Sequence, residues 1–140
     1  MAVVHADASI TLVRPAQLAP QVPYAYAAVV KLGRAVFTAG ACPLGPDGKT
    51  VAHGDVVAQA QQVMANLVTT LQAAGAGLTD VVKTTVYVAS SQRTDLVAAW
   101  NVVRAVFGDH DAPSTLVGVQ VLGYPDQLVE VEAIAVRNDS

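Results

Sequence analysis

The spacing of apolar residues predicts two amphipathic helices. Between residues 55 and 74, apolar positions recur at intervals of three and four, which is the period of one helix face. Asp55 suits the N-cap of this helix, and Gly75 suits the position just past its end, where a positive φ is favoured. Residues 94–107 carry a second stripe of the same period. The members of that stripe are Leu96, Trp100, Val103 and Phe107.

Segments rich in β-branched and aromatic residues predict strands around these helices. They are residues 9–14, 26–32, 34–39, 81–89, 115–122 and 128–136. The short link at Gly33 predicts two strands joined around it as in a hairpin. The three prolines of residues 15–23 predict an extended lead-in, and residues 40–50 predict a loop.

This order of elements predicts an α+β fold in which two helices cover one face of a single mixed sheet. The length, 140 residues, fits a single domain over residues 1–140. Apolar residues make up 53% and charged residues only 14%, against about a quarter charged in an average domain. We therefore expect part of the apolar surface to be covered in an oligomer.

The charge pattern excludes some function classes. The net charge is −3, and the eight basic residues are scattered rather than clustered, so we expect no nucleic-acid partner. Cys42 is the single cysteine, so no intrachain disulfide can form. The first residues show no signal peptide and the chain shows no membrane-spanning run, which predicts no membrane association and a cytoplasmic location.

The common catalytic motifs are missing from the sequence, which has no phosphate loop, no GxGxxG, no GxSxG and no HExxH. Its histidines, His5, His53 and His110, are far apart and each is next to a predicted loop. We interpret them as solvated loop residues and predict no metal site.

Two carboxylates on the last predicted strand are more informative. Glu130 and Glu132 are two residues apart, so both project from one face, while Val129, Val131 and Ala133 face the helices. One interpretation is a solvated strand face. The other is that one glutamate lies in a half-buried cleft and orients or deprotonates a water molecule.

Three other residues leave alternatives open. Tyr24 is either a lid aromatic over a cleft or a packing residue. Cys42 is either a nucleophile or a small buried residue, and no basic neighbour in the sequence favours the first. Asn101, on the second helix, contacts a substrate or faces solvent.

Four segments together resemble the RidA/YjgF family, often labelled endoribonuclease L-PSP. They are PYAYAAVVKLGRAVFTAG, the helix and strand from GDVVAQAQ to TTVYV, WNVVRAVFGDH and LVEVEAIAV. The resemblance covers residues 22–137. It implies a chorismate-mutase-like fold, a homotrimer whose sheets form a central β-barrel, and small-molecule clefts lined by residues of two neighbouring subunits.

The resemblance also implies an activity, the hydrolysis of reactive enamines and imines to a 2-keto acid and ammonia without metal or organic cofactor. Residue by residue, it implies a water-positioning role for Glu130. The implied substrate-binding residues are Tyr24, Gly40, Asn101 and Leu116, with Ser114 at the place of the usual carboxylate-binding arginine.

Serine is neutral and cannot form a two-point ion pair with a carboxylate. Ser114 therefore argues against standard 2-imino acid activity, and Arg104 or Arg14 is a possible replacement that the sequence does not decide between. The alternative hypothesis is a non-catalytic trimer that binds or regulates through a small molecule.

Overall fold

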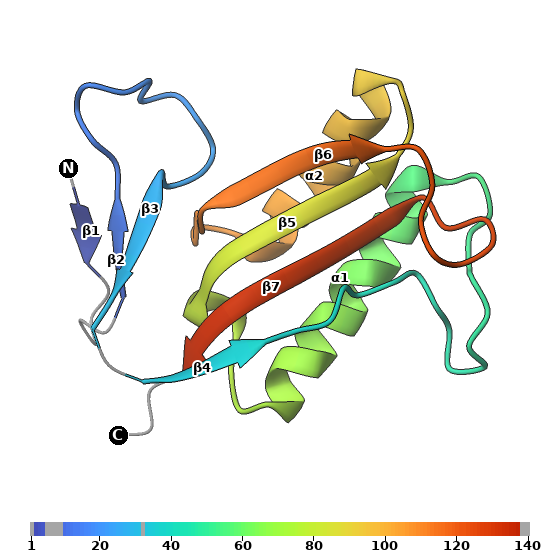
Figure 1. Ribbon diagram of the computed structural model, residues 1–140, viewed down its shortest axis with the longest axis horizontal. Helices are drawn as coiled ribbons and strands as arrows, with labels where there is room; N and C mark the ends of the chain where they lie inside the picture. The colour runs from blue at the N-terminus through green and yellow to red at the C-terminus, as the bar shows by residue number, and fades with distance from the viewer. Residues whose placement is uncertain (1, 5–9, 32, 138–140) are drawn as a thin grey trace.

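The computed structural model describes residues 2–4, 10–31 and 33–137. Within them the elements follow the order expected from the sequence, with an additional strand at the start and an additional short 3-10 helix before β5 (Figure 1). They are β1 (Ala2–Val4), β2 (Ile10–Val13), β3 (Ala27–Val30), β4 (Arg34–Phe37), α1 (Val56–Ala73), the 3-10 helix η1 (Leu78–Asp80), β5 (Val81–Ala89), α2 (Arg93–Phe107), β6 (Ser114–Val119) and β7 (Val129–Arg137).

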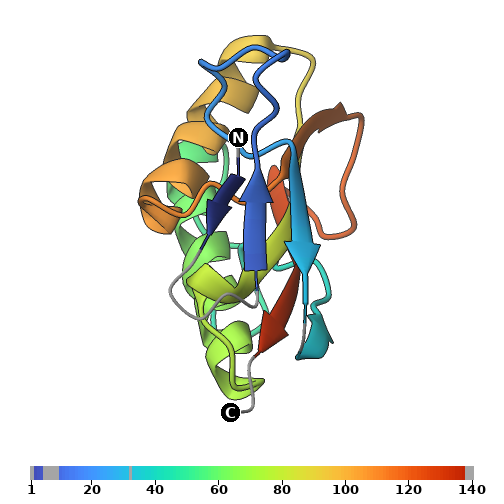
Figure 2. The same cartoon turned by 90° about the vertical axis from the view of Figure 1, so that its left-hand side faces the viewer.

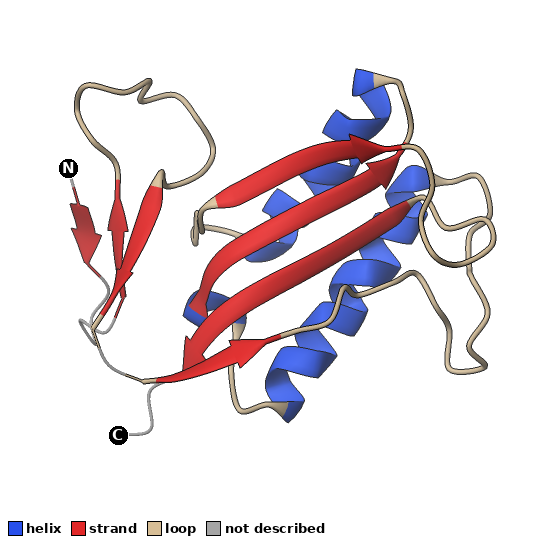
Figure 3. Ribbon diagram, viewed as in Figure 1, coloured by secondary structure: helices blue, strands red, loops and turns tan. Residues whose placement is uncertain are grey.

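The larger sheet has the strand order β4-β7-β5-β6 and is mixed. Strands β5 and β6 are parallel, whereas β7 runs antiparallel to both β5 and β4. Helix α2 is the crossover that a parallel pair requires. Both helices pack on one face of this sheet and leave the other open, as Figure 2 and Figure 3 show. The predicted α+β class, with two helices on one face of a mixed sheet, is confirmed, but the expectation of a single sheet is wrong, because the described strands form two sheets.

The hydrophobic core lies between this face and the helices. Val129, Val131 and Ala133 of β7 are buried there, as their alternation with the glutamates predicts. They meet the apolar stripe of α1, of which Leu67 and Leu71 are fully buried. The alternation of β7 therefore fixes which face of the sheet carries Glu130 and Glu132.

The helix ends have the predicted chemistry. The carboxylate of Asp55 accepts a hydrogen bond from the Ala58 amide at 2.9 Å, which caps α1. Gly75, just past the end of α1, has a φ of 79°, and Gly108 has a φ of 65° at the end of α2. Among the described residues, no helix combines the length and the apolar character that crossing a membrane demands.

The expected hairpin around Gly33 is wrong. Strand β3 pairs with β2, not with β4, and β1-β2-β3 form a separate antiparallel sheet, at the left of Figure 1. Each of the two strands pairs with another strand instead: β4 pairs with β7, and β3 pairs with β2. Gly33, with a φ of 129°, allows the chain to pass between the two sheets.

Other segments also differ from expectation. Strand β6 ends at Val119 rather than at residue 122. Residues 15–23 contain turns, including a hydrogen bond from the Leu18 amide to the Pro15 carbonyl, instead of running extended. Proline fixes φ near −65°, which suits the first central position of a turn as well as it suits an extended chain.

Candidate functional site

Glu130 lies on the open face of the larger sheet. On β5, Tyr87 is directly opposite Glu130, and Thr85 is opposite Glu132. Both glutamates are half-buried even without any covering layer. Burial and the neighbouring Glu132 carboxylate raise the pKa of Tyr87, which keeps its phenol protonated at neutral pH. The open face thus carries two acidic side chains beside a phenol that can donate a hydrogen bond.

A bulge after β4 brings Gly40 over Glu130. The pair Phe37–Ile134 and the bridge Ala41–Val131 are four residues apart on one strand and three on the other. One extra residue therefore lies on the first strand, which bends it toward β7. A Cβ atom at residue 40 would overlap Oε2 of Glu130. Only glycine leaves room for that carboxylate.

The two oxygens of Glu130 have different surroundings. Oε1 accepts hydrogen bonds from Sγ of Cys42 at 3.2 Å and from Nε2 of Gln127 at 3.1 Å. Gln127 is itself buried, and its side chain also bonds the Val129 carbonyl and the Tyr124 amide. Oε2 faces the Gly40 backbone. The carboxylate is therefore oriented through one oxygen, while the other keeps capacity for a ligand or a water molecule.

Cys42 acts in this arrangement as a donor. Partial burial, together with the hydrogen bond and charge of Glu130, raises the pKa of the Cys42 thiol from 9.0 to about 11. The thiol is therefore protonated at neutral pH, and only a thiolate is a good nucleophile. Of the two roles that the sequence left open for Cys42, the structure favours the non-nucleophilic one.

Polar side chains of α1 hold the loops that carry this cluster. Asn66 donates to the carbonyls of Cys42 and Leu44, at 2.9 and 3.0 Å. Gln59, fully buried, donates to the Asp126 carbonyl and accepts from the Leu128 amide at 2.7 Å. The sequence prediction missed Gln59, Asn66 and Gln127. Gln59 and Asn66 lie four residues before and three residues after Val63, a buried member of the apolar stripe of α1. A polar residue at such a spacing was the one signal in the sequence that could have identified them.

A second group of predicted residues lies beside α2. Tyr24, Ser114 and Leu116 line an open hollow of about 310 Å³ together with Pro23 and Trp100. The ring of Tyr24 stands edge-on to that of Tyr26, with centroids 5.6 Å apart. Tyr24 therefore packs on a neighbouring ring and also lines the hollow, so both roles considered for it are compatible.

The hydroxyl group of Ser114 forms hydrogen bonds within the protein. It donates to the Ala112 carbonyl at 3.0 Å, and the Thr84 hydroxyl lies 2.5 Å away. Because a hydroxyl has one proton, Thr84 donates to Ser114 in this network. Ser114 thus has no donor left for a ligand and offers at most an acceptor.

The two groups lie on opposite faces of the sheet. Leu116, Val86 and Val131 occupy one line across β6, β5 and β7, so they share the face covered by the helices. Glu130 is one residue away on β7 and faces the other side. One protomer therefore holds these residues in two separate groups, with Glu130, Gly40 and Cys42 in one and Tyr24, Ser114 and Leu116 in the other.

The remaining candidates are not part of either group. Asn101 is exposed on α2. His110 corrects the prediction of a solvated loop residue, because it is buried and its Nε2 lies 2.7 Å from the Val81 carbonyl. His53 is exposed, and His5 lies outside the described residues. In the described ranges, no three His, Cys, Asp or Glu side chains gather as a metal ion would need.

Comparison with known proteins shows to which family the chain belongs. The family model described as endoribonuclease L-PSP matches residues 16–137. The chain belongs to this family, RidA/YjgF. Among its relatives is the 2-iminobutanoate/2-iminopropanoate deaminase of Salmonella typhimurium, which is 38% identical over 125 residues, 88% of this chain and 91% of the relative.

Solved structures of the RidA/YjgF family agree with the fold. The conserved Rid-family protein YyfB of Yersinia pestis, of unknown function, has a TM-score of 0.86 at 33% identity and covers 92% of this chain and 99% of its own. Escherichia coli TdcF with bound serine has a TM-score of 0.65 at 33% identity, covering 90% and 98%.

Proposed function

We propose that this RidA/YjgF protein hydrolyses the C–N bond of a reactive imine or enamine, with Glu130 as the residue that holds the water. The observation that carries the proposal is the asymmetric carboxylate. Cys42 and Gln127 fix Oε1, and Oε2 beside Gly40 keeps its acceptor capacity. The deaminase activity in the name of the Salmonella relative supports the same chemistry.

The reaction needs only a positioned base that can also return a proton. Water adds to the carbon of the protonated imine while Oε2 of Glu130 takes one of its protons. The tetrahedral adduct then receives that proton on nitrogen and the C–N bond breaks. As the carbonyl forms, the hydroxyl proton of the adduct passes to Glu130 and from there to the departing ammonia. One protonated imine and one water molecule give one carbonyl compound and one ammonium ion, so Glu130 ends in its starting state. An enamine enters the same sequence after tautomerising to the imine.

A complete cleft requires a second copy of the chain, because the group of residues around Glu130 and the group around Ser114 lie on opposite faces of one sheet. We propose a homotrimer in which the open faces meet in a central barrel and the hollow beside Ser114 lies against the Glu130 cluster of a neighbour. The open face supports this, since Phe37 is 73% exposed there and Val117 is 36% exposed. The bound serine in the TdcF structure supports a small-molecule ligand.

The family description also names an endoribonuclease. The net charge of −3 and the scattered basic residues do not support RNA binding by this chain. A second function has better support, namely ligand binding without turnover. It is favoured by Ser114, whose only proton is already donated to the Ala112 carbonyl.

The decisive assay is ammonia release from imines generated in situ, with and without a carboxylate, beside the Salmonella deaminase as a positive control. Turnover above the uncatalysed rate with any of them supports the hydrolase. Binding of the keto products without ammonia release would establish the second function instead. If the protein neither turns over the imines nor binds the keto products, both functions are contradicted.

A further inference from the structure

Strands β3 and β4 each stand at the end of a sheet. Among the described strands, β3 pairs only with β2 and β4 pairs only with β7, so each has one edge that no strand covers. The link between them consists of residues 31–33 and ends in Gly33, as a three-residue β-hairpin loop does. The two strands nevertheless lie in different sheets and diverge from this link (Figure 1). The sequence thus encodes a hairpin that a single copy of the chain does not form.

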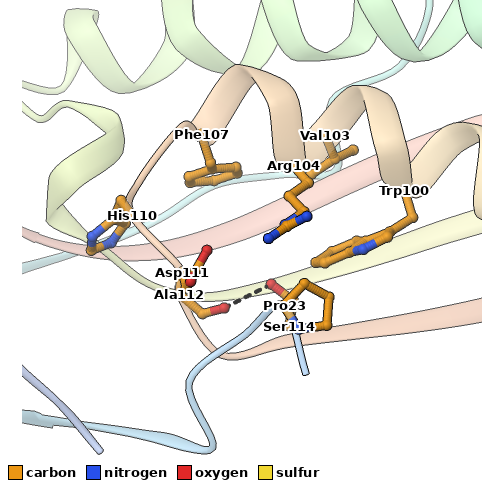
Figure 4. A pocket seen from close by; sticks show the side chains of 9 residues that line it. All are labelled: Pro23, Trp100, Val103, Arg104, Phe107, His110, Asp111, Ala112 and Ser114. Carbon is orange, nitrogen blue, oxygen red and sulfur yellow. Dashed lines mark hydrogen bonds between the residues drawn. The ribbon is translucent and has the colours of Figure 1, made fainter. Parts of the chain in front are cut away.

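Contacts within one copy hold β3 away from β4. The amide of Ala25, just before β3, donates to the Asp111 carbonyl at 2.8 Å. Arg14, just after β2, forms an ion pair with the Asp111 side chain at 2.8 Å. Figure 4 shows Pro23, which precedes β3, beside the ring of Trp100, and both residues line the same hollow. The small sheet is therefore anchored on its own copy, and β3 reaches the edge of a β4 strand only in another copy.

The uncovered edges of β3 and β4 match in length and in the faces of their side chains. Both strands have four residues, and the register of a three-residue hairpin places Ala28 opposite Val36. Ala28 packs against the core of the small sheet, and Val36 packs against the main core. The next pair is Val29, which is 58% exposed, and Ala35, which shares the open face with Phe37. Pairing of the two edges thus joins buried side to buried side and open side to open side.

We propose that β3 of one copy pairs antiparallel with β4 of the next copy, so that the small sheet of each chain extends the larger sheet of its neighbour. The inference rests on the proposed function for the number of copies and adds the strands that join them. Each copy gives β3 to one neighbour and receives a β3 strand from the other, which closes a ring of three. The exchange also covers two strand edges beside exposed apolar side chains, which otherwise favour aggregation.

The same register brings Tyr24 of one copy to the Glu130 carboxylate of the next. Residues 27 and 37 form the last pair of the two strands, and three residues farther on Tyr24 comes level with Gly40. The bulge after β4 changes this level by one residue. Because the Gly40 backbone lies against the carboxylate of Glu130, the exchanged strand carries a side chain of one chain into the site of another.

The test is a disulfide across the proposed pair of strands, in the Cys42→Ser background. Val29→Cys and Ala35→Cys lie opposite each other in this register, at a Cα separation that a disulfide spans. Oxidation in air links them between chains and gives covalent dimers and closed trimers of about 43 kDa on a non-reducing gel. Val29→Cys with Val36→Cys is the matched control, because residue 36 faces the other side of β4, and it stays at 14.4 kDa.

A disulfide within a single chain, the absence of cross-linking, or equal cross-linking of the control pair overturns the exchange. Light scattering on the same variants shows separately whether the trimer forms, so the exchange can fail while the proposed assembly survives. Hydrogen exchange of the wild type tests the pairing without any substitution. The amides on both edges of β3 exchange at rates within about tenfold of one another. Much faster exchange on the edge that faces away from β2 overturns the inference.

Discussion

The backbone of Gly40 runs against the carboxylate of Glu130, at a distance where a Cβ atom on residue 40 would overlap Oε2. The fit between them explains why the bulged segment carries a glycine although its φ lies outside the left-handed region that favours glycine. The contact is steric, and in the proposed reaction it defines the side from which a substrate and a water molecule reach Oε2.

Gly40→Ala should therefore displace the carboxylate. We expect the rate of ammonia release to fall about tenfold to 100-fold, because catalysis is sensitive to shifts of the order of 1 Å. The matched control is Gly123→Ala, since a Cβ at residue 123 meets no atom within 4 Å. Equal activity of the two variants would contradict the placement of Oε2 in the reaction.

Gln127→Met should weaken the orientation of Glu130 through its other oxygen. The variant loses the donor to Oε1 and leaves the Tyr124 amide without its side-chain acceptor. We expect a loss of about 1–3 kcal/mol in the free energy of unfolding, measured by urea titration. At a temperature where the variant is folded, we expect a lower kcat. Gln61→Met, at an exposed position of α1, should change neither quantity.

The raised pKa of Cys42 predicts a pH dependence of stability. The thiol titrates near 9.0 when unfolded and near 11 when folded, so between these values the folded protein holds a proton that the unfolded chain has lost. The contribution is fully present below pH 9, and the free energy of unfolding falls as pH rises from about 9 to about 11. Urea titrations across this window should show a smaller fall for Cys42→Ser, which has no thiol to titrate.

Alkylation checks the cause of that shift. Iodoacetamide should modify Cys42 slowly at pH 8, because the thiolate is the reactive form. Glu130→Gln removes the neighbouring charge, one of the causes of the raised pKa, and should speed alkylation. An unchanged rate in Glu130→Gln would mean that the contact between Sγ and Oε1 has no influence on the thiol.

The open face of the larger sheet predicts assembly. Three chains of 14.4 kDa give a particle of about 43 kDa, which light scattering on a size-exclusion column can measure. Phe37→Lys places a charge on an apolar side chain of that face and should yield smaller particles. Val57→Lys, on an exposed position of α1, should leave the mass unchanged. A wild-type monomer would contradict the proposed cleft.

Periodicity alone could predict the helices, the buried side of β7 and the face of Glu130, since these follow from spacings of two and of three to four residues. The partners of β3 and β4 could not be predicted, because β2 directly precedes β3 and competes with β4 for its edge, while β7 is far from β4 along the chain. The loops around Cys42 and Gln127 depend on hydrogen bonds with the side chains of Gln59 and Asn66. The spacing along the sequence shows that a polar residue stands among apolar ones, but it does not show which loop that residue contacts.

The resemblance to the RidA/YjgF family supplied the candidate site residues, but not their distribution over two faces. Glu130 and Leu116 are both strand residues, and which face each occupies depends on the register of β6 against β5 and of β5 against β7. A shift of one residue in either register would reverse the assignment. Register is set by the whole sheet, so it emerges only in the structure.

Ammonia release by Glu130→Gln and Glu132→Gln tests the central claim most directly. The two glutamates share a strand and a face, so either substitution removes one negative charge from the same surface. Glu130→Gln should lower kcat by about 100-fold or more, as expected for loss of a general base, and Glu132→Gln should stay within a few-fold of the wild type. Full activity of Glu130→Gln, or an equal loss in both variants, would contradict the assignment of Glu130 as the residue that holds the water.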